Sequence, residues 1–255
     1  SYFDKVQDYP MGCEDNKFII SLQNCGVTRG EDGLLYPVTE DLRNGNGRAI
    51  KSKLWSPVRV DRIDEPINAV FWLMKDQSLP PVLRLKGPDL AAVMGATLAT
   101  KRTTAERLAP GIDPNALVIE CYANPFRTYP LALDFERFRT LFKDGVDCYI
   151  LNTGDFMGKK VTPADTLGIL EAIIEEKARF VPFGPFSDME TLELERFPVD
   201  FADEKYRREF FARFRDRLAF VKSRETEKGG MDRLPPEAEA ALRKALDEMG
   251  YPVQD

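Results

Sequence analysis

Residues 152–166, NTGDFMGKKVTPADT, combine the residue types that bind anions at the start of a helix. An apolar run leads into the segment, glycines interrupt it, and Lys159 and Lys160 stand shortly before a helix-capping Thr162. Free backbone amides and the dipole at a helix N-terminus favour negative charge, to which two lysines add. The pattern therefore indicates a corner for a phosphate or another anion, with an ordinary strand-to-helix connection as the alternative.

Arg84 is the second candidate, within the stretch LPPVLRLK at residues 79–86. Pro80 and Pro81 restrict the backbone to an extended conformation directly after an apolar, strand-like run. We therefore expect Arg84 in a rigid position near the carboxyl end of that strand, where open α/β sheets bind ligands. Spacing alone fits a purely structural arginine equally well.

A phosphate-loop spacing at residues 45–52, GNGRAIKS, is misleading. Ile50 replaces the second glycine, and its side chain disfavours the conformation that wraps backbone amides around a phosphate. The following residues, with Pro57 among them, are typical of a strand and not of the helix that such a loop opens. We therefore assign no phosphate binding to this segment.

An arginine-rich helix is predicted at residues 203–224. Contact with phosphate or RNA is one interpretation of its positive charge. Acidic residues alternate with the arginines, which favours a solvated face of ion pairs instead. The arginines are Arg207, Arg208, Arg213, Arg215 and Arg217, and the acidic residues are Asp203, Glu204, Glu209 and Asp216.

Alternating strand and helix patterns position the two candidate segments. Asp134 and Thr162 are predicted to cap helices, and Gly145 to end one. The alternation predicts an α/β fold in which helices flank a mixed β-sheet. The predicted strands are 68–74, 116–122 and 146–152, and the predicted helices are 89–100, 134–145 and 162–178.

The chain divides into three stretches by pattern. Residues 1–65 are expected to form a β-rich segment packed on the main domain, residues 66–181 an α/β nucleotide-binding-like core, and residues 182–255 a C-terminal helical region. In the first stretch, the predicted strands are 18–22, 33–38 and 54–63, with a hairpin turn at 43–48. In the last stretch, a loop-like segment at 183–198 precedes helices at 203–224 and 234–250, which a flexible joint at 228–230 connects.

Composition excludes several classes of protein. The 255 residues carry a net charge of −6, which disfavours binding to nucleic acid or to an anionic membrane. No apolar run is long enough to span a bilayer, and the first residues lack the pattern of a signal peptide. We therefore expect a cytoplasmic protein without nucleic-acid or membrane partners.

Histidine is absent from the chain, and the four cysteines are far apart. This spacing excludes a structural zinc site, and the lack of histidine excludes catalytic triads that depend on it. Free thiols are the expected state, with a Cys13–Cys25 disulfide as the alternative. The other two cysteines are Cys121 and Cys148.

Three blocks in the same order resemble consecutive parts of ATP-dependent phosphoenolpyruvate carboxykinase. They are FWLMKDQSLPPVLRL at 71–85, ALVIECYANPF at 116–126 and VDCYILNTGDFMGKKVTPADTLGILEAI at 146–173. The most specific motifs are L-P-P-V-x-R-L and N-T-G followed by G-K-K. The resemblance covers roughly residues 58–180 and implies the fold of the family's C-terminal nucleotide-binding domain.

The resemblance implies a role for each matching residue. Arg84 matches the family arginine that approaches the γ-phosphate and the substrate, and it is the implied catalytic residue. A rigid guanidinium can neutralise the charge on a phosphoryl group in transfer, and a strand-to-helix loop can edge a purine. The implied nucleotide-binding residues are Gly158, Lys159, Lys160, Val161, Thr162 and Thr166.

Several positions depart from the family pattern. Asp155 stands where the family has tryptophan, and Pro163 and Ala164 replace an Ile-Lys pair beside the base, so base specificity is in question. The family's phosphate-binding loop and its metal-binding aspartate, lysine and histidine have no match at residues 1–65. No metal-binding residue is therefore assigned.

We expect the chain to be the C-terminal part of a carboxykinase-like protein, with a bacterial carboxykinase-like group as one placement. It would contribute the adenine side of an ATP site for phosphoryl transfer involving a small carboxylate, and would be inactive by itself. The resemblance implies ATP and a divalent metal in the full-length protein, with no cofactor tightly bound here, and its N-terminal domain as the partner. The alternative is a catalytically inactive domain with a structural role or one in binding a partner or metabolite.

Overall fold

The computed structural model describes residues 2–5, 22–23, 26–38, 48–51, 64–101, 111, 113, 116–124 and 127–250. The chain forms two compact units. One consists of Ser1–Pro66 with Lys101–Ala116, and the other of Ile67–Thr100 with Leu117–Asp255. Both candidate segments belong to the second unit.

The first unit contains short antiparallel strands. A hairpin turns at Gly33, whose φ of 82° suits glycine, and Asp32 accepts hydrogen bonds from the Leu34 amide and the Tyr36 hydroxyl. The end of the phosphate-loop spacing lies in strand β5, which was not predicted, since the strand expected here was at 54–63. Strands β1 (Tyr2–Lys5), β5 (Arg48–Lys51) and β2 (Leu22–Gln23) pair in that order, and β3 (Gly26–Arg29) pairs with β4 (Leu35–Val38).

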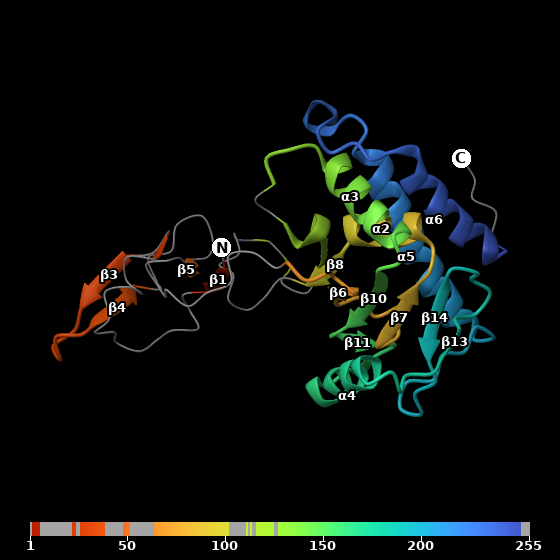
Figure 1. The fold of residues 1–255 in the computed structure, drawn as a ribbon, viewed down its shortest axis with the longest axis horizontal. Helices are drawn as coiled ribbons and strands as arrows, with labels where there is room; N and C mark the ends of the chain where they lie inside the picture. The colour runs from red at the N-terminus through yellow and green to blue at the C-terminus, as the bar shows by residue number, and fades with distance from the viewer. Residues whose placement is uncertain are drawn as a thin grey trace. The chain divides into compact units, whose positions relative to one another are not determined.

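A mixed five-stranded sheet forms the centre of the second unit (Figure 1). Its strand order is β13-β14-β7-β10-β6, in which only β6 and β10 are parallel neighbours. This arrangement confirms the predicted α/β class with a mixed sheet. The strands are β6 (Ala69–Met74), β7 (Val82–Leu85), β10 (Asp147–Asn152), β13 (Phe180–Pro182) and β14 (Met189–Leu192).

Helices cover both faces of this sheet (Figure 1). Among the described residues, four helices pack on one face around a large apolar core that includes Trp72, Phe135, Phe210 and Leu242. The fifth, α4, packs on the other face through Ile169. The four are α2 (Pro88–Ala96), α3 (Leu131–Lys143), α5 (Glu204–Ser223) and α6 (Pro236–Glu248), and α4 is Pro163–Ile174.

Two predicted elements near the start of the core are wrong in extent. The helix expected at 89–100 ends at Ala96, because Thr97 leaves helical geometry and its hydroxyl donates to the carbonyl of Val93. Strand β8 (Ala99–Lys101) follows and pairs with β9 (Leu117–Ile119). The buried strand expected at 116–122 is thus shorter, partly buried and outside the main sheet, and it leads into a 3₁₀ turn, η3 (Cys121–Ala123).

Other corrections concern helix ends and a missed strand. Helix α3 begins at Leu131 after Pro130, so Asp134 lies inside its first turn and is not the N-cap. Helix α4 ends at Ile174, four residues short of the predicted end at residue 178. The segment expected to be loop-like contains strand β14, in which Thr191 pairs with Leu83 of β7. The side chains of β14 alternate and pack on both faces of the sheet.

Several predictions lie outside the described residues. They are most of the strand at 18–22, the turn at 43–47, the strand at 54–63 and the Cys13–Cys25 disulfide. Cys121 and Cys148 are free thiols. The joint at 228–230 lies in a 3₁₀ turn, η4 (Glu227–Gly230). Within the described ranges, no helix combines the length and apolar character needed to cross a bilayer.

Candidate functional site

A tight hairpin carries the first residues of the predicted nucleotide-binding set. Strands β11 (Asp155–Phe156) and β12 (Lys159–Lys160) pair across a turn in which Met157 and Gly158 have φ values of 47° and 82°. Both values are positive, as a two-residue hairpin turn of this hand requires. A Cβ added at Gly158 would meet no atom within 4 Å apart from its chain neighbours. The hairpin therefore presents Gly158 at an accessible tip.

The start of α4 is closed by its own side chains. Thr162 is the N-cap, as predicted, and its amide and hydroxyl each donate to Asp165 Oδ2 at 2.7 Å. Hydrogen bonds from Thr162, with those of Arg196, hold the pKa of the Asp165 carboxyl below its ordinary value. The positive end of this helix therefore already holds a carboxylate, so an anion arriving there meets a negative charge.

The other members of this set have different environments. Lys159 donates to the carbonyl of Arg196 at 2.6 Å and lies 5.5 Å from the Phe197 ring centroid. Val161 is buried in the core, and the Thr166 hydroxyl donates to the carbonyl of Thr162. Lys160 is exposed, and no ion pair joins it within the described part of the chain. Lys160 and Gly158 are thus the members most open to a ligand.

Arg84 lies on the sheet face that α4 covers, but not at the expected place. It is level with Tyr149 of β10, and Tyr149 is level with Phe71 in the middle of β6. The expectation of a position near a strand's carboxyl end was therefore wrong, because β7 runs antiparallel to β10 and carries Arg84 away from that end. Asn152, from which the hairpin follows, is three residues beyond Tyr149, about 10 Å along the strand.

Glu190 and Lys86 complete a charged cluster with Arg84. Both Nε and Nη2 of Arg84 donate to Glu190 Oε2, the former at 2.8 Å, and Lys86 Nζ lies 3.0 Å from Glu190 Oε1. The Arg84 guanidinium lies 4.7 Å from the centroid of the Phe180 ring. Two cations thus share one carboxylate on a sheet face that is partly open, with the Arg84 side chain 32% exposed.

The pKa values in this cluster move in the directions that ion pairing favours. Burial tends to raise the pKa of Glu190, but its hydrogen bonds with Lys86 and Arg84 outweigh burial and lower it. Burial likewise tends to lower the pKa of Arg84, and the hydrogen bond and charge of Glu190 reverse this. Near neutral pH Arg84 and Glu190 are therefore both charged.

A buried polar network at the ends of β6 and β10 was not predicted. Asp76, just after β6, pairs with Arg217 of α5, and Asn152 donates to the carbonyls of Asp76, Leu79 and Asp155. One signal was available, because Arg217 falls at an apolar position of its helix between Phe214 and Val221. The network fixes the backbone from which the hairpin starts.

Two of the remaining arginines of α5 fit the solvated-face interpretation. Arg208 pairs with Glu204, and Arg213 pairs with Glu209 and Asp216. These contacts bear out, for Arg208 and Arg213, the expectation that acidic neighbours on the helix neutralise its arginines.

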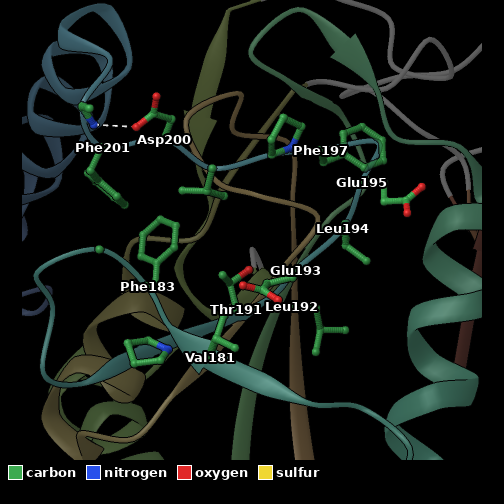
Figure 2. Close-up of a pocket in the computed structure, with 15 residues that line it drawn as sticks. Val181, Phe183, Thr191, Leu192, Glu193, Leu194, Glu195, Phe197, Asp200 and Phe201 are labelled. Carbon is green, nitrogen blue, oxygen red and sulfur yellow. Dashed lines mark hydrogen bonds between the residues drawn. The ribbon is translucent and has the colours of Figure 1, made fainter.

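A separate hollow of about 830 Å³ lies beside β13, β14 and residues 193–202 (Figure 2). Phe183 and Phe201 lie on one side of it, and Leu194 and Glu195 on the other. Its lining includes Glu193 and Asp200 but no lysine or arginine, and none of the predicted site residues. The hollow therefore does not suit the anion that the predicted residues would bind.

Within the described residues, no three side chains of the metal-binding types come together. In comparisons with known proteins, no family model and no curated protein matches the chain.

Proposed function

We propose that the chain contributes the adenine side of an ATP site in a carboxykinase-like protein that transfers a phosphoryl group to or from a small carboxylate. Arg84 would neutralise charge on the moving group, and the hairpin and the start of α4 would hold the nucleotide. The observation that supports this most directly is the pair of cations, Arg84 and Lys86, on the partly open sheet face beside α4. Cations on and beside a rigid strand can stabilise the negative charge of a phosphate group.

The nucleotide would meet the residues of the hairpin that remain open. Gly158 leaves space for close approach, and Lys160 offers an ammonium group without an ion pair in the described structure. ATP would supply the transferable phosphoryl group, and the divalent metal would be bound by residues outside the described part. The proposal therefore gives this chain one side of a composite site.

Another part of the same protein is the proposed partner. Strand β6 is an edge of the sheet, and its Leu73 is exposed, as are Leu167 and Ile174 of α4. Exposed apolar side chains beside a free strand edge are typical of a surface that a further element covers. This supports a contribution to a larger assembly.

A second candidate is a carboxykinase-like domain that binds a partner or metabolite without catalysis. It is favoured by the internal carboxylates, because Glu190 already pairs with Arg84 and Asp165 already caps α4. The two candidates differ in whether the hairpin binds nucleotide.

Amide chemical shifts of the labelled chain during titration with Mg-ATP would separate them. The first candidate predicts shifts at Gly158, Lys160 and Thr166 with a Kd on the order of 1 mM, since only one side of the site is present. Lys160→Gln should weaken this binding, whereas the matched change Lys177→Gln, beyond the other end of α4, should not. An absence of shifts in this segment at saturating nucleotide would reject the first candidate in favour of the second.

A further inference from the structure

Glu190 occupies the centre of the Arg84 and Lys86 cluster. Its carboxylate uses one oxygen for Arg84 and the other for Lys86. Its side chain is only 15% exposed, whereas those of Arg84 and Lys86 are 32% and 48% exposed. The carboxylate is therefore the innermost member of the cluster, and the two cations shield it from solvent.

The sheet fixes this arrangement. Arg84 and Glu190 are directly opposite each other on β7 and β14. The Lys86 amide donates to the carbonyl of Asp188, so the ladder continues past Leu85. Oppositely charged residues facing each other on neighbouring strands interact without rearranging the backbone. The cluster is thus preformed.

The contacts that Glu190 makes are those an oxyanion ligand would make. Nε and one Nη of a guanidinium form the fork that recognises carboxylate and phosphate, and an ammonium group supplies a further point charge. Both partners are bound to Glu190. A ligand at these cations must therefore displace the carboxylate or bind against its charge.

We infer that Glu190 is a resident counter-anion that occupies the oxyanion position between Arg84 and Lys86 and restricts which ligands bind there. A phosphate or carboxylate group enters this position only by displacing the Glu190 side chain. The inference rests on one part of the proposed function, namely that Arg84 and Lys86 bind a ligand. It adds that the selectivity of the site is set by a residue of β14.

The test is binding of inorganic phosphate and, separately, of malonate to wild type and Glu190→Gln, measured by calorimetry. Gln keeps the size of the side chain and removes its charge, leaving two cations without a counter-charge. Glu190→Gln should bind at least one of these anions about tenfold more tightly or better. A gain in phosphate binding identifies the ligand as a tetrahedral oxyanion, and a gain in malonate binding identifies it as a carboxylate.

Two variants show whether the gain arises at this cluster. Glu193→Gln changes the net charge equally, and Glu193 is an exposed residue of the hollow with no ion pair in the described structure. It should leave anion binding unchanged. The double variant Glu190→Gln/Arg84→Gln should lose the gain, with thermal unfolding of each protein showing that it is folded. Equal binding by wild type and folded Glu190→Gln, or an equal gain in Glu193→Gln, would overturn the inference.

The outcome separates this inference from the proposed function. An Arg84-dependent gain in phosphate binding without any Mg-ATP shifts at the hairpin would support the resident anion and reject the nucleotide site. Nucleotide binding at the hairpin without a gain in anion binding by Glu190→Gln would support the nucleotide site and reject the resident anion.

Discussion

Asp76 and Arg217 form an ion pair in the interior, with Asp76 Oδ2 2.8 Å from Arg217 Nη2 and side chains that are only 1% and 2% exposed. The pair joins the segment after β6 to α5. Arg217 also donates to the carbonyl of Thr97, between α2 and β8. Three segments distant in sequence thus converge on one guanidinium, and Asn152, just before the β11–β12 hairpin, donates to the carbonyl of Asp76 in the same network.

Removing one partner of this pair should be strongly destabilising. Arg217→Met leaves the Asp76 carboxylate buried without a counter-charge, and we expect a loss of about 3–5 kcal/mol in the free energy of unfolding. Arg208→Met is a matched control, because Arg208 pairs with Glu204 on the exposed side of the same helix and should cost less than about 1 kcal/mol. Urea unfolding measures both. Similar losses in the two variants would contradict the role given to the buried pair.

Gly95 should not tolerate a side chain. A Cβ there would lie 2.6 Å from Cζ2 of Trp72 and 2.8 Å from Cε1 of Tyr122, two rings fixed in the core. Gly95→Ala should therefore lower the free energy of unfolding by about 1–3 kcal/mol, despite the better helix propensity of alanine. Gly168→Ala in α4 meets nothing within 4 Å and should be neutral or stabilising by up to about 1 kcal/mol. Urea unfolding in which both variants shift in the same direction would refute the packing argument.

Glu190 should contribute a pH-dependent part of stability. Its pKa in the folded chain is below the ordinary value of 4.5. A lowered folded pKa means that the ion pairs stabilise the fold above pH 4.5 and are lost as the pH falls through the folded pKa. The free energies of unfolding of wild type and Glu190→Gln should therefore differ less at about pH 3 than at neutral pH. A constant difference across this range would show that the charge of Glu190 is not responsible.

The two described thiols should react slowly in the native protein. Burial is the main cause that raises the pKa of Cys121 to about 11, and burial raises the pKa of Cys148 further. Little thiolate, the reactive form, is then present near neutral pH. Iodoacetamide followed by peptide mass spectrometry should find Cys148 unmodified in the native chain and modified in urea. Equal labelling rates in the two states would be incompatible with its burial.

Local chemistry predicted much of the second unit. The apolar runs at 68–74 and 146–152 became β6 and β10, and Thr162 caps α4 as its position before Pro163 indicated. These features depend on neighbouring residues, whose preferences the sequence displays. Strand β14 was missed because its residues, METL, have weak strand character, and only its pairing with β7 makes it extended.

The candidate site was predicted in its residue types but not in its contacts. Sequence order indicated that Arg84 and the hairpin residues belong to one region, yet nothing local placed Glu190 beside Arg84. The two residues are 106 positions apart, and the register between β7 and β14 brings them together. Likewise, Arg217 looked like one more charge on a solvated helix until packing buried it against Asp76.

By itself, the sequence determined most of the central strands and helices of the second unit, the start of α4 at Thr162 and which charged residues the chain carries. The tertiary structure decided which charges meet and which are satisfied. The reason is physical: backbone preferences act over a few residues, whereas an ion pair depends on strand register and helix packing set by the whole core. Whether Arg84 faces a ligand or Glu190 is decided at that second level.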